Sequence, residues 1–172
     1  MKLSDIKSYI EGTSGPAIEI AGPTLHGYAF LDKHAIQMPL DLIITNIAKQ
    51  IEVWDRRKDT MVLKSVDEVA NITNLPYETN SVSLLFVSNL SITAGNGNDA
   101  IKEAKREYEH PLDPVTNLHL FLYKEASRVL VPNGLLIQVG AFEEDLDAIL
   151  KYPLTNEFNF IDNEETIVLR RN

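Results

Sequence analysis

The sequence has no cysteine among its 172 residues. This absence excludes a disulfide framework, a thiolate nucleophile and any sulfur-ligated metal site. Long apolar runs are missing too, since none approaches the roughly 20 residues that a membrane-spanning helix needs. Residues 1–12 mix charged and apolar side chains at helical spacing and lack the unbroken apolar core of a secretory signal. We therefore expect a cytoplasmic protein with no membrane segment.

Positive charge is scarce. Lys and Arg number 16 against 25 Asp and Glu, which gives a formal net charge of −9. Nucleic-acid binders usually gain affinity by neutralising phosphates with basic side chains, so this balance argues against a nucleic-acid partner. A small molecule or a protein is the expected partner, and the oligomeric state stays open.

Histidine is also sparse. The four histidines are His26, His34, His110 and His119, and none of them has the spacing of a metal-ligand pair. Each could act as a base, but an ordinary polar or packing role is the simpler interpretation. The sequence predicts no metal site.

What the chain does contain is an alternation of apolar runs with helix-forming segments. Strands are predicted at 17–21, 42–47, 66–72, 81–90 and 135–140, and a terminal hairpin at 158–161 and 166–169. The length suits a single domain, 1–172. The order predicts an α/β fold: a doubly wound, Rossmann-like, mainly parallel seven-strand sheet with helices on both faces and an antiparallel C-terminal hairpin.

Helical patterns fill the connections. They cover 1–15 as an N-terminal helix or cap, a polar helix-like segment at 49–58, and 96–110, 115–130 and 142–152. Residues 91–114 exceed what a simple crossover needs and suggest an insertion. Asn133 and Gly134 are predicted to end the helix at 115–130, with Gly134 in the left-handed conformation.

Two motifs are more specific than these patterns. One reads Asn71-Ile72-Thr73-Asn74-Leu75-Pro76-Tyr77, and the other reads Glu125-Ala126-Ser127-Arg128-Val129-Leu130-Val131-Pro132-Asn133-Gly134. They resemble class I S-adenosylmethionine-dependent methyltransferases of the type 11 kind. In that family an acidic residue, a small residue and Leu-Pro-Phe follow the third strand, and Glu-Ala-x-Arg-Val-Leu-x-Pro-Gly-Gly precedes the fifth. The resemblance extends over roughly residues 16–170.

This resemblance implies a site for S-adenosylmethionine at the carboxyl ends of the strands. Glu19 fills the acidic position of the family's acidic-x-Gly-x-Gly-x-Gly loop, but Ala21, Pro23 and Leu25 stand at the three glycine positions. Gly22 is displaced by one residue. Pro23 lacks an N–H, and Leu25 fills space that a ligand would need.

The two nucleoside anchors have also changed. Asn46 stands where the family has an acidic residue for the ribose hydroxyls, and Asn71 where it has one for the adenine amino group. Ile72 would pack on adenine, and Ser88 and Asn89 would face the methyl acceptor. The residues assigned to the cofactor are Glu19, Ala21, Gly22, Asn46, Asn71, Ile72 and Ser88. We expect Ala21, Gly22, Asn46, Asn71 and Ser88 to line one cleft.

Two functions remain open. The first is a methyltransferase that acts on a small molecule or a protein side chain. The second is a non-catalytic binding or scaffold protein on the same fold, because an Asn at position 46 or 71 could equally bond nearby backbone groups. Tyr9 could close over the cofactor, although a core contact is the more usual role of such a residue. A nicotinamide-dependent oxidoreductase is a distant third, since the phosphate-binding loop is missing.

Overall fold

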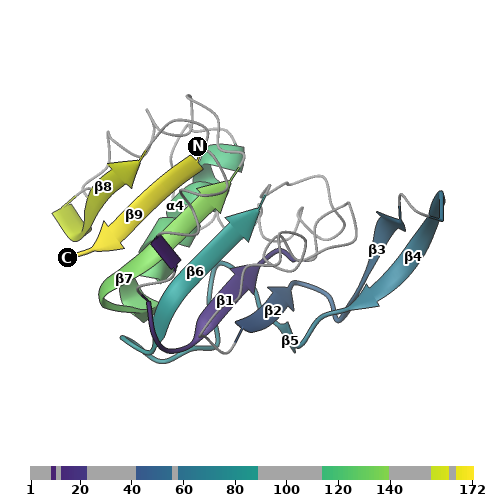
Figure 1. The fold of residues 1–172 in the computed structure, drawn as a ribbon, viewed down its shortest axis with the longest axis horizontal. Coiled ribbons are helices and arrows are strands. Elements are labelled where there is room, and N and C mark those ends of the chain that lie inside the picture. Colours follow the sequence, from purple (N-terminus) through teal and green to yellow (C-terminus); the bar gives the residue numbers. More distant parts are fainter. Residues whose placement is uncertain are drawn as a thin grey trace.

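The computed structural model describes residues 9–10, 13–22, 42–55, 58–88, 114–139, 156–162 and 166–172. The strands are β1 (Ala17–Ile20), β2 (Leu42–Asn46), β3 (Gln50–Asp55), β4 (Thr60–Ser65), β5 (Glu68–Val69), β6 (Val82–Ser88), β7 (Leu130–Val139), β8 (Phe158–Asp162) and β9 (Thr166–Arg171). The helix α4 spans Pro114–Val129. Figure 1 shows their arrangement.

Seven of these strands form one sheet in the order β5-β2-β1-β6-β7-β9-β8, and β3 and β4 form a separate two-stranded sheet. Neighbouring strands from β5 to β7 run parallel, whereas β9 is antiparallel to both β7 and β8. The predicted seven-strand, mainly parallel sheet is confirmed. So is the antiparallel pairing of the two C-terminal runs.

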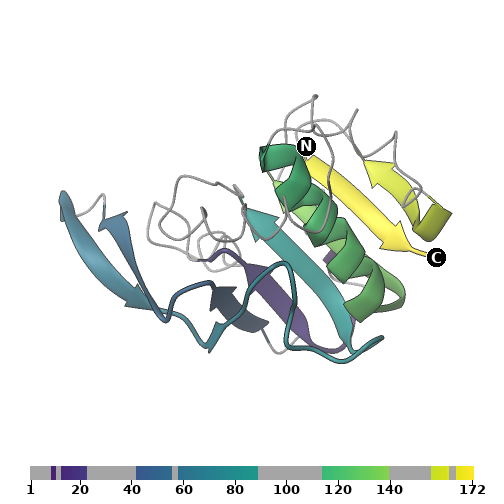
Figure 2. The same cartoon turned by 180° about the vertical axis from the view of Figure 1, so that it is seen from behind.

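Both faces of the sheet are buried because apolar residues occupy successive positions of its central strands. In β6, Leu85 and Val87 belong to a cluster that includes α4, while Leu84 and Phe86 belong to a cluster on the other face. Figure 2 shows α4 lying across the first face. Ile10, fully buried, joins the cluster on the second face.

Several expectations fall outside the described residues. These are the helices at 96–110 and 142–152, the insertion at 91–114 and most of the N-terminal segment. Within that segment Tyr9 and Ile10 are helical, and Tyr9 packs against the same cluster as Ile10. This contact is the core role expected for Tyr9.

The two family-like motifs bind each other. Arg128 on α4 donates to the carbonyl oxygens of Leu75, at 2.8 Å, and Tyr77, at 2.6 Å. Glu125 accepts from the Leu75 N–H at 2.7 Å and forms an ion pair with Arg128 at 2.6 Å. The pair therefore fastens the β5–β6 connection to the helix, and the hydrogen bond to Glu125 raises the pKa of Arg128.

Three local predictions were wrong. The helix-like segment at 49–58 contains β3, which pairs in register with β4 from Gln50↔Ser65 to Asp55↔Thr60. Alternation of polar and apolar residues along β3 is the period of a strand, and its partner β4 satisfies its backbone groups. The strand predicted at 66–72 is only Glu68–Val69, because Asn71 to Asn74 form a turn.

The third correction concerns the end of α4. The helix ends at Val129 and β7 begins at once, with Leu130 opposite Val82 and Leu135 opposite Leu84. Residues 131–134 therefore bulge opposite a single residue of β6. Asn133, not Gly134, has the left-handed conformation, with φ 65°. Gly134 is needed for space, since a Cβ there would lie 2.8 Å from the Val131 carbonyl oxygen.

Candidate functional site

The carboxyl ends of the central strands meet at one edge of the sheet. Ile20 is in register with Thr45 of β2 and Val87 of β6, so Ala21, Asn46 and Ser88 follow at that edge (Figure 1). The Gly22 N–H donates to the Thr45 carbonyl oxygen at 3.1 Å and extends the pairing past β1.

Asn71 reaches the same edge through the turn after β5. Val69 is in register with Asn46, and the Ala70 N–H donates to the Asn46 carbonyl oxygen at 2.9 Å. Topology thus brings together the strand ends that carry Ala21, Gly22, Asn46, Asn71 and Ser88. That their side chains line one cleft stays a prediction.

Ala21 has an unusual backbone conformation, with φ 61°. The other described non-glycine residues with positive φ are Asp59, Asn80 and Asn133. Asp and Asn tolerate this region through local hydrogen bonds, whereas alanine has no such compensation. The loop after β1 therefore has a glycine-like backbone at a position that lacks glycine.

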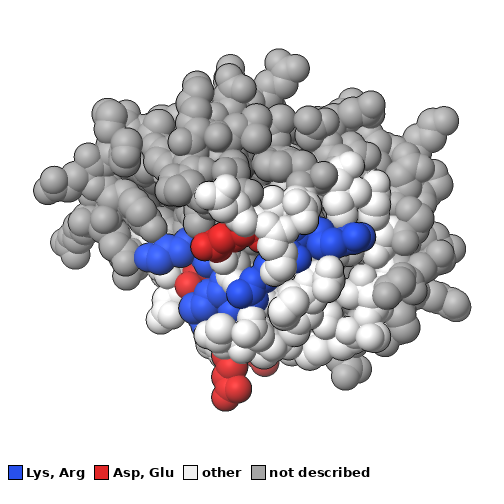
Figure 3. Space-filling model, turned by 90° about the vertical axis from the view of Figure 1, so that its left-hand side faces the viewer, with Lys and Arg blue, Asp and Glu red and all other residues white. Residues whose placement is uncertain are grey.

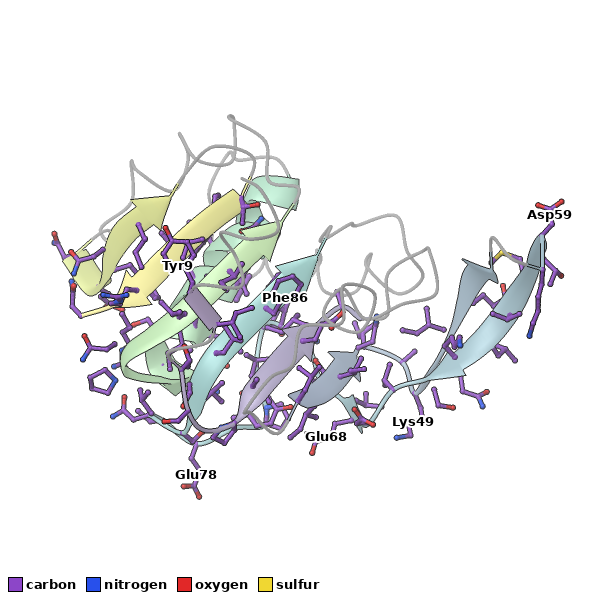
Figure 4. The ribbon with its side chains drawn as sticks, in the orientation of Figure 1. Tyr9, Lys49, Asp59, Glu68, Glu78 and Phe86 are labelled. Carbon is purple, nitrogen blue, oxygen red and sulfur yellow. The ribbon has the colours of Figure 1, made fainter. Side chains whose placement is uncertain are left out.

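Gly22 packs directly on the buried side chain of Glu19. A Cβ at Gly22 would lie 2.8 Å from Glu19 Oε1 and 2.9 Å from Ile44 Cγ2. Glu19 is fully buried, and its neighbours in register are Ile44 and Phe86; Figure 4 labels Phe86 in the middle of the sheet. The carboxylate lies beneath the loop, and only glycine leaves room for it there.

Asn46 ties the loop after β1 to the end of β2. Its Nδ2 donates to the Gly22 carbonyl oxygen at 3.0 Å, and its Oδ1 accepts from the Ile47 N–H at 2.7 Å. Both polar atoms of the side chain thus bond backbone groups. The amide oxygen retains a second lone pair, through which it can still accept from a ligand hydroxyl.

Asn71 and Ile72 also have local partners. Asn71 Oδ1 accepts from the Thr73 N–H at 3.0 Å, and the Asn74 N–H closes the turn onto the Asn71 carbonyl oxygen at 3.0 Å. Ile72 is buried in the cluster that includes α4. These contacts are those of a short turn stabilised by the Asn71 side chain, and this turn changes the direction of the backbone after β5.

Sequence reasoning missed the side chains that hold β5 in place. Lys49 donates to the carbonyl oxygens of Val66, at 2.6 Å, and Asp67, at 2.7 Å. Asp67 in turn accepts from the Ile44 N–H at 2.8 Å. No local sequence pattern predicts these hydrogen bonds, because each one joins residues that only the fold brings together.

Tyr77 contributes a further contact beside β5. Its hydroxyl donates to Glu68 at 2.9 Å. Burial raises the pKa of Tyr77, and the hydrogen bond and charge of Glu68 raise it further. Figure 4 labels Glu68 below the edge of the main sheet and Lys49 below the segment that leads to the β3–β4 hairpin.

Other candidates lie outside the described residues, namely Asn89, Pro23, Leu25, His26, His34 and His110. Within the described ranges, no group of three His, Asp or Glu side chains is placed to hold a metal ion. No helix in the same ranges is long and apolar enough to cross a membrane.

No protein-family model matches the chain, and no curated protein is similar to it in sequence. Solved structures do match. A putative type 11 methyltransferase from Sulfolobus solfataricus is 14% identical, with 98% of this chain and 89% of that one covered and a TM-score of 0.49. An S-adenosyl-L-methionine methyl transferase from Silicibacter pomeroyi is 13% identical, with the same coverages and a TM-score of 0.48.

A geranyl diphosphate methyltransferase, solved in complex with GPP and sinefungin, is 15% identical with a TM-score of 0.44. The match covers 78% of this chain but 42% of that chain, so this chain spans less than half of its length. Likenesses at this distance concern the fold. The strand order and register themselves define a Rossmann-like fold, with the antiparallel pair β9 and β8 at one edge.

Proposed function

We propose that the carboxyl-end edge of the seven-stranded sheet binds S-adenosylmethionine, and that the protein transfers its methyl group to a small molecule or a protein side chain. The observation that carries this proposal is Ala21. A non-glycine residue in the left-handed region costs about 1–3 kcal/mol and persists mainly where surrounding structure and function require that backbone. Ala21 adopts it at the first glycine position of the family's cofactor loop.

The residues present fit such a ligand in part. The left-handed backbone at Ala21 gives the loop after β1 the conformation of a glycine loop, and Asn46 offers its second lone pair to a ribose hydroxyl. Asn71 stands at the adenine position. Bound S-adenosylmethionine supplies the electrophilic methyl group, and the chain's own contribution is alignment of the acceptor, for which Ser88 and Asn89 are the candidates.

A second function is favoured by a different observation. The amide oxygens of Asn46 and Asn71 already accept hydrogen bonds from nearby backbone N–H groups, those of Ile47 at 2.7 Å and Thr73 at 3.0 Å. Groups satisfied in this way need no ligand, which suits a binding or scaffold protein that has lost the cofactor site.

Calorimetric titration with S-adenosylmethionine and with its demethylated product separates the two. Micromolar binding supports the methyltransferase, and no heat at millimolar ligand supports the scaffold, since these affinities differ by about 4 kcal/mol. Asn46→Ala should weaken binding at least tenfold. Glu78→Gln is the matched control because Glu78 lies near the amino end of β6, away from the proposed site (Figure 4). Equal losses in both variants would contradict the proposed location.

A further inference from the structure

The β3–β4 hairpin stands apart from the main sheet (Figure 1). In the described part of the chain β3 and β4 pair only with each other. An isolated two-stranded hairpin is marginally stable in water, and an unpaired strand edge is a template for another chain. The hairpin is therefore incomplete as a structural unit.

Its outer strand exposes large apolar side chains. Met61 is 48% exposed and Leu63 is 62% exposed. They are two positions apart on β4 and so lie on one face, opposite Trp54 and Glu52 of β3 in the register. Apart from half-buried Val62, every residue of β4 is exposed.

We propose that β4 pairs with β4 of a second copy of this chain. The pairing is antiparallel about a two-fold axis through Val62. Val62 then lies opposite Val62 of the second copy, Met61 opposite its Leu63, and Leu63 opposite its Met61. The two hairpins become one four-stranded sheet in the order β3-β4-β4-β3.

The sequence of β4 favours this register over its neighbours. With the axis moved to Met61, Leu63 would face Asp59 of the second copy. With the axis at Leu63, Met61 would face Ser65. Only the register centred on Val62 sets both exposed apolar residues against apolar residues, and it places the strand's one charge, Lys64, opposite Thr60 at the end of the contact.

The contact is small. Stable interfaces bury about 1,200 Å² or more, and one strand pair with its side chains buries less. We therefore expect a dimer that dissociates at micromolar concentrations. This pairing does not depend on whether the protein binds S-adenosylmethionine.

The absence of cysteine provides a direct test. Val62→Cys introduces the single thiol of the chain, and the proposed axis sets it opposite the same thiol of the second copy. Directly opposite residues of an antiparallel pair have Cα atoms about 4.5–5.5 Å apart, within the range for a disulfide. Under mild oxidation this variant should cross-link to a dimer at least tenfold faster than Val69→Cys, its control on exposed β5.

Sedimentation equilibrium on the uncross-linked protein completes the test. The weight-average mass should rise from 19.3 kDa towards twice that value with concentration. Leu63→Lys should weaken association at least tenfold, and Val69→Lys should leave it unchanged. A protein that stays monomeric at high concentration overturns the proposal, as do equal cross-linking rates for the two cysteine variants or an assembly insensitive to Leu63→Lys.

Discussion

At the scale of single residues, the loop after β1 concentrates the unusual features of the molecule. Ala21 takes a glycine backbone without being glycine, while Gly22 is glycine because Glu19 and Ile44 leave no room for a side chain. Glycine is usually favoured at a position either for its conformation or for its small size, and the two reasons apply here to different residues. One requires its conformation and the other requires its small size.

Ala21→Gly should therefore stabilise the protein by about 1 kcal/mol. Removing the Cβ relieves the left-handed conformation by about 1–2 kcal/mol, and the greater freedom of glycine in the unfolded chain offsets part of this gain. Urea unfolding followed by circular dichroism measures the change. Ala17→Gly in buried β1 is the control and should destabilise, since it removes packing and adds freedom to the unfolded chain without relieving a left-handed conformation.

Asn46→Asp should destabilise the ligand-free protein by about 1–3 kcal/mol. The substitution replaces the Nδ2 donor with an oxygen that faces the Gly22 carbonyl, so a hydrogen bond becomes a repulsion. Thermal unfolding would detect the loss. If S-adenosylmethionine binds at Asn46, the new carboxylate should accept from the ribose, and the ligand should raise the melting temperature more in the variant than in the wild type.

Because the pKa of Tyr77 is raised in the folded protein, we expect the stability of the protein to decline at alkaline pH. Burial and Glu68 raise this pKa, so the unfolded state loses the phenolic proton first, above a pH of about 10. From there stability falls as pH rises through the folded pKa, because the unfolded state binds fewer protons. Tyr77→Phe should flatten this fall in urea midpoints measured between pH 9 and 11, and an unchanged slope would show that Tyr77 does not cause it.

At the scale of elements, one ion pair lies at the centre of the contact between α4 and the β5–β6 connection, beside backbone hydrogen bonds from Asn80 and Ser81 to the end of the helix. Glu125 is 6% exposed, and Arg128 joins it to two carbonyl oxygens. Arg128 can make these bonds together because its guanidinium presents several donors in one plane. The two motifs thus have a clear structural role, whatever activity the protein has.

Arg128→Lys should therefore destabilise by about 2 kcal/mol, although it conserves the charge, because an ammonium cannot replace the planar donor set. Arg128→Met should lower the free energy of unfolding further, since it leaves Glu125 buried without its cation. Chemical unfolding measures both. Lys124→Gln, at an exposed position of the same helix, is the comparison and should change stability by less than about 0.5 kcal/mol. Equal effects of Lys and Met at position 128 would contradict the geometric argument.

Elements with a strong apolar pattern could be predicted from the sequence. The runs that became β1, β2, β6 and β9 were placed within a few residues, because strands that pack into the core are mostly apolar. The β3–β4 hairpin could not be predicted from the sequence. Half of its strand residues are polar and β4 is exposed apart from Val62, so pairing between β3 and β4, not burial, makes these residues strands.

The candidate site was predictable in position but not in contacts. Strand ends follow from the alternation of elements, so the edge shared by Ala21, Asn46 and Ser88 could be expected. The bond from Asn46 to the Gly22 carbonyl spans 24 residues. This contact depends on the parallel pairing of β1 with β2, and the spacing of residues along the sequence does not indicate that pairing.

At the scale of the whole molecule, β9 completes the main sheet. It lies between β7 and β8 and buries Thr166 to Leu169. Lys and Arg side chains gather on the end of the molecule seen in Figure 3, and β9 at that end carries Arg170 and Arg171. Arg171 donates to the Leu130 carbonyl oxygen and to Asn80 Oδ1. Part of this scarce positive charge is therefore used to join β9 to the junction of α4 and β7.

Truncation after residue 163 should prevent stable folding. It removes β9, leaves β8 without a partner, frees one edge of β7 and takes Ile167, Val168 and Leu169 out of the two core clusters. The truncated chain should lose its cooperative thermal transition and bind a hydrophobic dye. Deletion of Asn172 alone removes only peripheral bonds at the end of β9 and should retain the transition. A cooperative transition in the longer truncation would show that the sheet is stable without β9.

The strand order also bears on how the protein is made. The ribosome delivers β7, then β8, and only then β9, the strand that must lie between them. During that interval the nascent chain has an open, apolar strand edge with no correct partner yet available, and β8 could pair with it wrongly. Chaperone capture, translation speed across residues 140–165 and growth temperature should therefore influence the yield of folded protein more strongly than its final thermodynamic stability does.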